Sequence, residues 1–423
     1  MPILNPLSSA FGLDISDRSF KLIQMSKRSR SKYPYRVSAW GAIDIPEGVL
    51  ERGDLKDVDQ AAALLTKLLR TTRGRIKGRG VVACLPETRT FVKMIEATQD
   101  NLKEGVEKLV TTEIEQNIPL TKEDIYYDYQ LVAMGENRME PQEHQPTEEP
   151  VEETPKEDEA KKGEDAGEKE KGQEAGQEAE TPPTETAEEG SEETISDNQK
   201  YYLIIAAAPR ELVDSYTALL EKTGLAPIAL EIEAMSITRA LTPAGEHFKD
   251  PIGLLDIGAT RSSLVIFDEG VLKMTVSIPL SGIEITETIA EKLQLEMENA
   301  EKLKIECGLD ANRCDDKIWT TIAPLIEDIT EKIRNALRFY QVGVPSGRKI
   351  EKLLLCGGGA HFREIDAVLS RKLAIKVVRG DSLINVNPSL PKGFTPNRSL
   401  AFTTAIGLGI RAANEYESYK KRF

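Results

Sequence analysis

The stretch of residues 251–267 constrains the fold more than any other part of the sequence. Residues 252–256 have the pattern of a buried strand that ends on Asp256, a Gly-Ala-Thr-Arg turn follows, and residues 262–267 form a second apolar strand. This pattern predicts a β-hairpin whose turn can face a phosphate. Gly258 allows close backbone approach and a positive φ, and the turn N–H groups and the Thr260 hydroxyl can donate to anionic oxygens.

Asp256, at the tip of the first strand, is a candidate magnesium residue. Mg²⁺ prefers a few carboxylates and keeps much of its hydration shell, so a single Asp can hold the ion through water. The alternative interpretation is an ordinary hairpin with an Asp turn.

A second copy of the hairpin pattern lies near the start of the chain, in residues 10–25. Aligning Asp14 with Asp256 superimposes the apolar residue before each acid and another apolar residue in each returning strand. Two such hairpins, about 240 residues apart, indicate a duplicated fold. We expect two facing halves that grip a nucleotide between them.

Length and composition exclude several classes of protein. A chain of 423 residues is long enough for two or more domains. It has no run of about 18 apolar residues, so we expect no transmembrane helix, and its start lacks the features of a secretory signal peptide. The four cysteines show no CxxC pair, and only three histidines argue against a His-rich zinc site. Cys84 and Cys356 fall within apolar strands, which favours reduced core thiols in a cytosolic protein.

The acidity of the chain belongs to one segment. Residues 136–199 contain 23 acidic and 6 basic residues, a net charge of −17, whereas the whole chain carries −15, which leaves +2 for the rest. The segment has no aromatic residue and is rich in Glu, Lys, Gly, Gln, Pro and Thr. Because it cannot bury enough apolar surface to offset its chain entropy, we expect it to be disordered.

The rest of the chain alternates strand and helix patterns. We expect the strand at 201–209 to pair with 125–132, so that the acidic segment forms an oversized hairpin loop. The further strands are expected at 35–45, 81–85, 90–95, 228–232, 271–280, 352–356 and 375–378. Helices are expected at 59–73, 101–117, 211–223, 234–241, 284–305, 319–340, 361–372 and 399–415.

A basic run at residues 70–79 follows the helix expected at 59–73. One interpretation is a nucleic-acid contact. The other, which we favour, is a solvated helix end and loop, because cations are favourable at that end of the helix dipole and no aromatic residue interleaves with the basic ones.

Two later motifs also suit a nucleotide. Gly357, Gly358 and Gly359 lie between a buried strand and a helix, where bare backbone lets a flat ligand approach and the helix N-terminus adds donors. Glu301 and Lys304 are three apart on a helix and share a face, so the acid can accept ribose hydroxyls beside a lysine. The alternative for that pair is a surface ion pair.

The order of these motifs resembles the superfamily of actin, the sugar kinases and the heat-shock chaperone ATPases. It resembles more closely the PilM family of type IV pilus assembly, a relative of the division protein FtsA. The resemblance covers nearly the whole chain except 135–199, and the pattern of residues 113–132 and 201–225 is similar to the small subdomain inserted in PilM and FtsA. The matching motifs are Gly12-Leu13-Asp14-Ile15 with Lys21, Asp256-Ile257-Gly258-Ala259 with Thr260, Gly282 with Thr286, Ala300-Glu301 with Lys304, Phe339-Tyr340, Gly357-Gly358-Gly359-Ala360, and Ala405-Ile406-Gly407-Leu408 with Arg411.

The resemblance implies that ATP and Mg²⁺ bind in a cleft between the two halves. By motif, Asp14 and Asp256 position the metal and the phosphates, Lys21 and the two turns bind phosphate, Glu301 and Lys304 flank the ribose, and the three glycines border the adenosine. It identifies no catalytic residue, so at most slow ATPase activity is expected. The implied cofactor-binding residues are Asp14, Ser16, Lys21, Asp256, Gly258, Thr260, Glu301, Lys304, Gly357, Gly358 and Gly359, and the implied metal residues are Asp14 and Asp256.

The fold that the resemblance implies is the α/β actin-like ATPase fold, with two duplicated halves and a small α+β subdomain inserted in the first. We expect the first half at 1–86, completed by 229–250 and 399–423. The inserted subdomain is expected at 87–228, with the disordered acidic loop at 135–199, and the second half at 251–398.

The resemblance also implies partners and a location. The protein is expected to be cytoplasmic and peripheral at the inner membrane, where the inserted subdomain grips the cytoplasmic tail of a PilN-like membrane protein. Other pilus or secretion assembly components are expected partners, self-association is left open, and neither nucleic-acid binding nor direct membrane insertion is expected.

Two residues depart from the family pattern. Ser16 and Asp17 stand where the family usually has Gly and a small residue. Ser16 adds a side chain near the phosphate path and Asp17 adds negative charge, so both are expected to weaken ATP binding.

Three functions are therefore compared. The first is a nucleotide-binding scaffold of a pilus or related secretion machine. The second is a metabolic, sugar-type kinase of the same superfamily, for which the sequence shows neither a catalytic acid nor a substrate pocket. The third is an FtsA-like filament protein tethered by its C-terminus, but the tail YESYKKRF lacks a clear apolar face.

Overall fold

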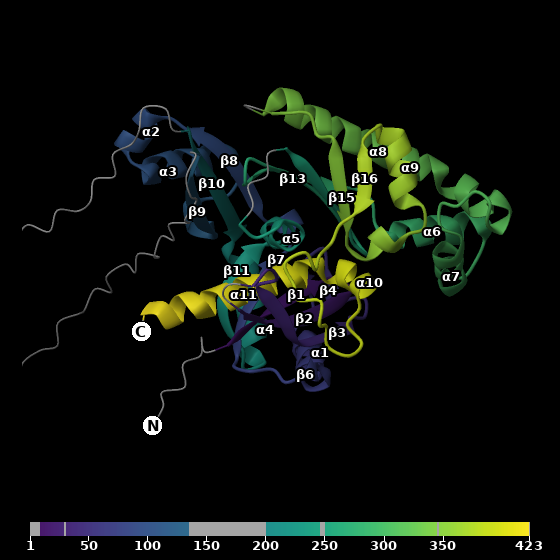
Figure 1. Cartoon of the computed structure of the whole chain (residues 1–423), viewed down its shortest axis with the longest axis horizontal. Helices are drawn as coiled ribbons and strands as arrows, with labels where there is room; N and C mark the ends of the chain where they lie inside the picture. Colours follow the sequence, from purple (N-terminus) through teal and green to yellow (C-terminus); the bar gives the residue numbers. More distant parts are fainter. Residues whose placement is uncertain (1–8, 29–30, 135–199, 246–249, 345–346, 423) are drawn as a thin grey trace, which may run out of the picture. The chain divides into compact units, whose positions relative to one another are not determined.

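The computed structural model describes residues 9–28, 31–134, 200–245, 250–344 and 347–422 (Figure 1). The disordered loop expected at 135–199 lies outside the described residues. Within them the structure has three larger sheets, in the orders β11-β7-β1-β2-β3-β6, β8-β10-β9 and β14-β13-β12-β15-β16. The fold class expected from the sequence is confirmed.

The six-stranded sheet mixes parallel and antiparallel pairs. Strands β1, β7 and β11 run parallel, so their carboxyl ends lie at one edge, while β2 and β3 are antiparallel neighbours. A small separate hairpin, β4 with β5, follows β3 in the chain. The bounds are β1 Ala10–Ser16, β2 Ser19–Lys27, β3 Tyr35–Asp44, β4 Leu50–Glu51, β5 Asp54–Leu55, β6 Arg73–Gly74, β7 Gly80–Leu85 and β11 Ala226–Ile232.

Helices cover this sheet on both faces because side chains alternate along a strand. Phe11 and Leu13 of β1 pack in one apolar cluster with Leu65 of α1 (Val58–Thr71) and Tyr216 of α4 (Arg210–Lys222). On the other face, Ile23 of β2 packs with residues of α5 (Glu233–Leu241) and α11 (Thr403–Arg422). Because α4 belongs to this core, we propose that the inserted subdomain ends before α4 rather than at residue 228.

The three-stranded sheet is antiparallel and carries two short helices. The expected pairing of the strand after residue 200 with the strand near 125–132 is confirmed, since β10 pairs with β9 along its length. Val110 and Ile114 pack against Leu203 and Ile205 of β10. The bounds are β8 Phe91–Ala97, α2 Gln99–Glu104, α3 Val106–Asn117, β9 Ile125–Met134 and β10 Lys200–Pro209.

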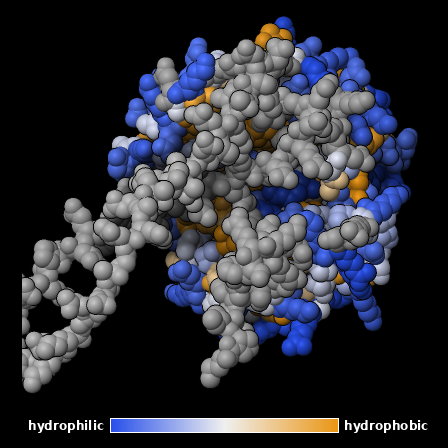
Figure 2. All heavy atoms as spheres, turned by 60° about the vertical axis from the view of Figure 1, so that its left-hand side comes forward, coloured by the Kyte–Doolittle hydropathy of each residue, from blue (hydrophilic) through white to orange (hydrophobic). Residues whose placement is uncertain are grey.

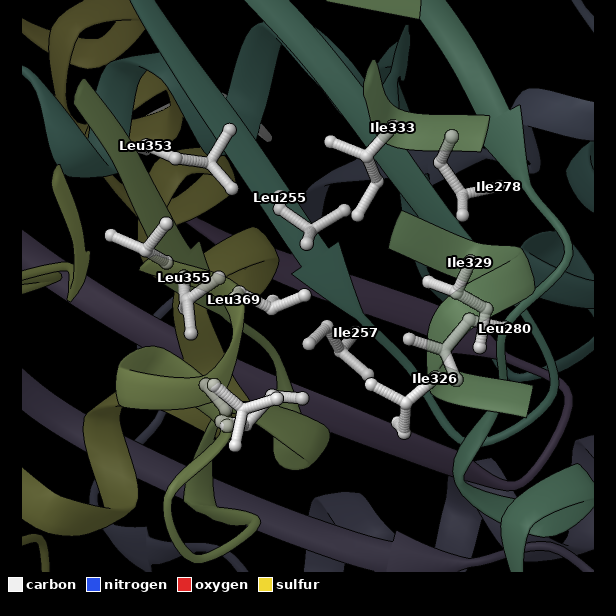
Figure 3. Packing of buried hydrophobic residues seen from close by; sticks show 14 of the residues in the cluster. Leu255, Ile257, Ile278, Leu280, Ile326, Ile329, Ile333, Leu353, Leu355 and Leu369 are labelled. Atoms are coloured by element: carbon white, nitrogen blue, oxygen red, sulfur yellow. The ribbon is translucent and has the colours of Figure 1, made fainter. Parts of the chain in front are cut away.

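The five-stranded sheet holds the largest apolar cluster. Figure 3 shows side chains of β12 and β15 packed with Ile326, Ile329 and Ile333 of the long helix α8. Alternate strand residues such as Leu255 and Ile257 point into this cluster, which buries one face of the sheet. The bounds are β12 Ile252–Ile257, β13 Ser262–Asp268, β14 Val271–Ile278, α6 Gly282–Leu293, α7 Met297–Cys307, α8 Lys317–Gly343, β15 Lys352–Cys356, α9 Ile365–Leu373, β16 Lys376–Arg379 and α10 Pro396–Ser399.

The two hairpins repeat each other in register. Leu13 lies opposite Leu22 in the first, and Leu255 lies opposite Leu264 in the second. Each acid-bearing strand also pairs in parallel with a strand on its other side, β7 in the first half and β15 in the second. The duplication expected from the sequence is therefore present in hydrogen bonding as well as in residue pattern.

Three expected helices are wrong in extent, and each break has a local cause. The helix expected at 101–117 is divided between α2 and α3 at Gly105, whose φ is +103°. The helix expected at 284–305 is divided between α6 and α7, with Gln294 left-handed at φ +55°. The helix expected from 361 begins only at Ile365, after a 3-10 turn at Gly358–His361 and a left-handed Glu364. Apolar spacing continues across such breaks, so periodicity alone does not reveal them.

Helix α11 packs directly on backbone at two glycines. A Cβ added to Gly12 of β1 would lie 2.3 Å from the nitrogen of Gly409, and a Cβ added to Gly407 would lie 1.9 Å from the oxygen of Ser236 on α5. Both glycines therefore permit an approach that no larger residue allows.

The cysteines divide into two kinds. Cys84 and Cys356 are free and buried, as expected. Cys307, the last residue of α7, forms a disulfide with Cys314, with Cα atoms 5.9 Å apart, and the sequence did not suggest this pair.

A buried ion cluster ties α5 and α11 to the end of β11. The Glu231 carboxylate accepts from Arg239 Nη1 at 2.7 Å and from Arg411 Nη1 at 2.7 Å. Burial alone would raise the pKa of Glu231, but the two guanidinium groups outweigh it and lower that pKa. The charged cluster thus stabilises the packing of both helices.

We expect Glu231→Ala to lower the free energy of unfolding by roughly 3–5 kcal/mol, because it leaves two guanidinium groups without their buried carboxylate. Chemical denaturation measures this, with the exposed Glu221→Ala as the matched control. The contribution of Glu231 to the free energy of unfolding is fully present above its ordinary pKa of 4.5. It is lost as the pH falls through the lower pKa of Glu231 in the folded protein. Equal stability of the two variants at neutral pH would contradict the assignment.

Candidate functional site

The tips of the two hairpins meet at a cavity of about 200 Å³. It is bordered by the carboxyl ends of β1 and β12, by both hairpin turns, and by the segments that follow β7, β11 and β15. Its wall includes eight of the expected site residues, namely Asp14, Ser16, Lys21, Asp256, Gly258, Thr260, Gly357 and Gly358.

Lys21 lies among the acids of both halves. Its Nζ donates to Asp14 Oδ2 at 3.0 Å, because Lys21 stands opposite Asp14 in the hairpin register. Burial would lower the pKa of Lys21, but the charges of Asp14 and Asp256 outweigh this and raise it. Lys21 therefore stays charged and offsets the negative charge of the two carboxylates.

Each central acid has a buried thiol beside it in the neighbouring parallel strand. Cys84 Sγ lies 3.9 Å from Asp14 Oδ1, and Cys356 Sγ lies 3.7 Å from Asp256 Oδ1. Burial and the adjacent carboxylate raise the pKa of both thiols. The duplication thus extends to the residue next to each Asp, and both thiols are neutral weak donors.

Two further acids, Glu87 and Glu233, line the cavity although the sequence analysis did not select them. Burial raises the pKa of Glu233 to about 8 and that of Glu87 to about 7. Burial, together with the charge of Asp14, raises the pKa of Asp256 to about 6. The cavity therefore retains protons near neutral pH, chiefly because its carboxylates are buried and in addition because they repel one another.

A sequence signal for these two acids existed. Glu87 follows β7 after one proline and Glu233 follows β11 directly, just as Asp14 stands near the end of β1. The carboxyl ends of parallel strands meet at one edge of a sheet, so acids at these positions converge. Without the strand order, however, the sequence does not show that these strands are neighbours.

The residues present fit a divalent cation. The cavity wall has five acids against the three bases Arg18, Lys21 and Arg261. Buried atoms of Glu87 (Oε2) and Arg261 (Nη1) have no hydrogen-bond partner within the described part of the chain. No group of three or more metal-ligating side chains occurs among the described residues. Such a site suits Mg²⁺, which takes one or two carboxylates together with phosphate oxygens and water.

Asp17 already binds the hydroxyl of Thr260 in the second turn. Its carboxylate accepts from Thr260 Oγ1 at 2.8 Å and from the backbone nitrogen of Gly53 at 2.8 Å, and it lies 3.7 Å from Arg261 Nη1. The residue is 5% exposed. The Thr260 hydroxyl, expected to donate to a phosphate, is therefore bound to an internal carboxylate that joins the two hairpin turns.

The glycines of the site act by close approach. A Cβ on Gly357, whose φ is +80°, would lie 2.1 Å from Asp256 Oδ1, and a Cβ on Gly359 would lie 2.2 Å from an Ile257 methyl carbon. Gly258 is not among the residues with positive φ, so that expectation is wrong. It is needed instead because a Cβ there would lie 2.6 Å from the Arg261 oxygen.

Three expected residues are not on the cavity wall, which does not include Gly359, Glu301 or Lys304. Lys304 Nζ pairs with Glu301 at 2.6 Å and donates to the Gly282 oxygen at 2.8 Å. The Gly282 nitrogen in turn donates to the Gly258 oxygen at 3.0 Å. The Glu301–Lys304 pair thus reaches the second turn through Gly282 and does not itself face the cavity.

The chain is similar to known proteins along most of its length. The family model described as type IV pilus assembly protein PilM matches residues 12–145 and 191–413. A solved structure described as the PilM-PilN type IV pilus biogenesis complex contains a chain with a TM-score of 0.69 and 22% identity, over 96% of this chain and 98% of that chain, which shows a shared fold.

Among curated relatives, the cell division protein FtsA of Agrobacterium fabrum is 25% identical over 231 residues, and FtsA of Rhizobium radiobacter matches equally. These matches cover 47% of this chain, and the chain spans about half of the length of the FtsA relatives, 51%.

We expect Asp17→Asn to strengthen Mg-ATP binding. Asn keeps the shape and can still accept from Gly53, but it removes one negative charge and releases the Thr260 hydroxyl as a donor. For an assumed charge separation of about 6 Å and an effective dielectric of 20–80, loss of a unit charge corresponds to roughly a three- to hundredfold gain in affinity. Calorimetric titration measures it, with the exposed Asp44→Asn as control. Unchanged or weaker binding in a folded Asp17→Asn protein would contradict this role.

Proposed function

The chain belongs to the PilM family of type IV pilus assembly proteins, and we propose that it serves a type IV pilus or related secretion assembly as an ATP-binding scaffold. The family membership supports the assembly role, and the cavity supports the nucleotide. We further propose that the protein is cytoplasmic and reaches the inner membrane through a partner. Among the described residues, no helix combines the length and the apolar character needed to span a membrane.

One observation carries the nucleotide proposal. Two hairpins of the same register bring Asp14 and Asp256 to one cavity, where Lys21 forms an ion pair with Asp14. Mg²⁺, when bound, would neutralise phosphate charge and orient the phosphates. The residues that would hold it are Asp14 and Asp256.

The charge of the cavity supports a requirement for magnesium. ATP is a polyanion, and those carboxylates of the cavity that are charged repel it unless a cation intervenes. Lys21 would then contact phosphate oxygens, while Gly357 and Gly358 would leave room for the nucleoside beside Asp256. Since no described cavity residue is identified as orienting an attacking water, we propose that hydrolysis is slow or absent.

The partner proposal concerns the three-stranded sheet and its helices. The solved relative is a complex of PilM with PilN. We propose that a PilN-like tail binds the inserted subdomain, whose described part exposes Leu120 (42%) and Tyr126 (43%). Contacts with other assembly components, and self-association, are proposed alongside it.

The nucleotide proposal is tested by equilibrium titration with ATP, with and without Mg²⁺. We expect magnesium-dependent binding that Asp256→Ala weakens more than Glu301→Ala does, because Asp256 lines the cavity and Glu301 does not. The expected difference is roughly tenfold or more, since hydrogen bonds and metal contacts of charged groups contribute about 1.5–3 kcal/mol. Equal titration curves for the two variants, or no binding at millimolar ATP, would refute the assignment.

The partner proposal is tested with a synthetic peptide that copies the cytoplasmic tail of the PilN-like protein from the same source. We expect the Leu120→Asp, Tyr126→Asp double variant to bind it at least about tenfold more weakly, since truncating interface anchors costs about 1–2 kcal/mol or more. Phe339→Asp is the matched control, because Phe339 is also exposed (62%) but lies on α8. Equal loss in the control would argue against docking on the inserted subdomain.

A further inference from the structure

Two segments of the first half contain no acidic residue. Residues 18–43 and residues 60–86 have bases but no Asp or Glu, whereas the chain outside the acidic segment 136–199 mixes both signs to a net charge of only +2. The second segment includes the basic run at 70–79, to which the nucleotide site gives no role. The position of both segments in the fold therefore needs an explanation.

The topology brings these segments to one end of the six-stranded sheet. Lys27, the last residue of β2, lies opposite Tyr35, the first residue of β3. The run at 73–79 begins at the edge strand β6, beside β3, and leads into β7, whose first residue Gly80 lies opposite Ala10 of β1 and Ala226 of β11. The run therefore crosses the sheet end where β1, β7 and β11 begin.

Gln24 joins the two segments. Its Nε2 donates to the Lys77 oxygen at 2.7 Å, and its Oε1 accepts from the Lys77 nitrogen at 2.9 Å. Gln24 is 3% exposed. Its two hydrogen bonds hold the basic loop against the sheet through the backbone of Lys77 and do not use the Lys77 side chain. The side chain of Lys77 is left exposed.

The two segments together expose ten Lys and Arg side chains, which we call the basic face. Within the described residues none of the ten makes an ion pair, although Arg73 stacks on Trp40 and Lys32 on Tyr33. The members are Lys27, Arg28, Lys32, Arg36, Lys67, Arg70, Arg73, Arg75, Lys77 and Arg79.

The nucleotide does not account for this charge. Asp14 and Ser16 line the cavity at the carboxyl end of β1, whereas the basic face lies at the amino end, beside Ala10. Ser16 lies six positions after Ala10 along the strand, about 20 Å at the usual rise per residue. Bases at that distance are largely screened from the cavity in physiological salt.

We propose that the basic face binds an anionic lipid surface directly. Clustered Lys and Arg side chains are attracted to anionic headgroups without a shaped pocket. In the two segments no described aromatic side chain is exposed, since Tyr33 is half-buried and Phe20, Tyr35 and Trp40 are buried. The nucleobases of a single-stranded nucleic acid would therefore find no aromatic surface on which to stack. The contact goes beyond the proposed function, because it needs neither nucleotide nor a PilN-like tail and does not insert into the bilayer.

The test is co-sedimentation of the full chain, without any partner, with vesicles of phosphatidylcholine alone or with about one third phosphatidylglycerol. We expect binding only to the anionic vesicles, and its loss in high salt. The Arg75→Gln, Lys77→Gln, Arg79→Gln variant is expected to bind at least about tenfold more weakly, from three surface charges near the membrane. The matched control is Lys349→Gln, Arg371→Gln, Lys376→Gln, which removes the same charge from exposed positions of the second half.

Three results would overturn the proposal. One is equal sedimentation with neutral and anionic vesicles, and another is an equal loss of binding in the control variant. The third is tighter binding to a double-stranded oligonucleotide than to anionic vesicles at the same salt concentration. If the Arg75→Gln, Lys77→Gln, Arg79→Gln variant loses this oligonucleotide binding, the basic face would be assigned to nucleic acid. Melting temperatures of both variants show whether each is folded, and titration with Mg-ATP shows that the distant cavity is unaffected.

Discussion

The crowding of carboxylates at the ends of parallel strands is the constraint on which the rest of the structure depends. Asp14 and Asp256 come from opposite halves, and each raises the cost of charging its neighbours. Lys21 offsets this within the cavity, and Asp17 is held by the Gly53 nitrogen and Thr260. Such repulsion is tolerated because the surrounding sheets, and not the site itself, supply the stability of the fold. The cavity wall, with five acids and three bases, offers ligands to a cation as well as to a phosphate.

Close backbone contacts hold these carboxylates in place. Helix α11 lies against β1 at Gly12 and against α5 at Gly407, and the Glu231 cluster with Arg239 and Arg411 ties the same helices to β11. Elsewhere, apolar packing dominates, as Figure 3 shows for the second half. Figure 2 shows that hydrophobic residues on the described part of one face form small groups among hydrophilic ones. The acids are thus fixed by buried elements rather than by flexible surface segments.

The features predicted well were those that a short stretch decides. Each hairpin has its own strand pattern and turn, and the register confirms the alignment of Asp14 with Asp256. The helix breaks at Gly105 and Gln294 were missed because a left-handed residue interrupts a helix without interrupting its apolar spacing. Glu87 and Glu233 were missed because each becomes part of the site only through the order of strands in the sheet.

The sequence by itself indicated the duplication and the two acids that face the cavity, because apolar alternation and turn residues act over a few positions, and its motifs indicated the fold class through their resemblance to a known family. Tertiary structure alone decided three other matters. It turned Thr260 toward Asp17, placed Glu301 and Lys304 one layer behind the cavity wall, and gathered two separate basic segments at one end of a sheet. Each depends on distances between residues far apart in the chain, and those distances are set by packing and strand order, which local patterns do not encode.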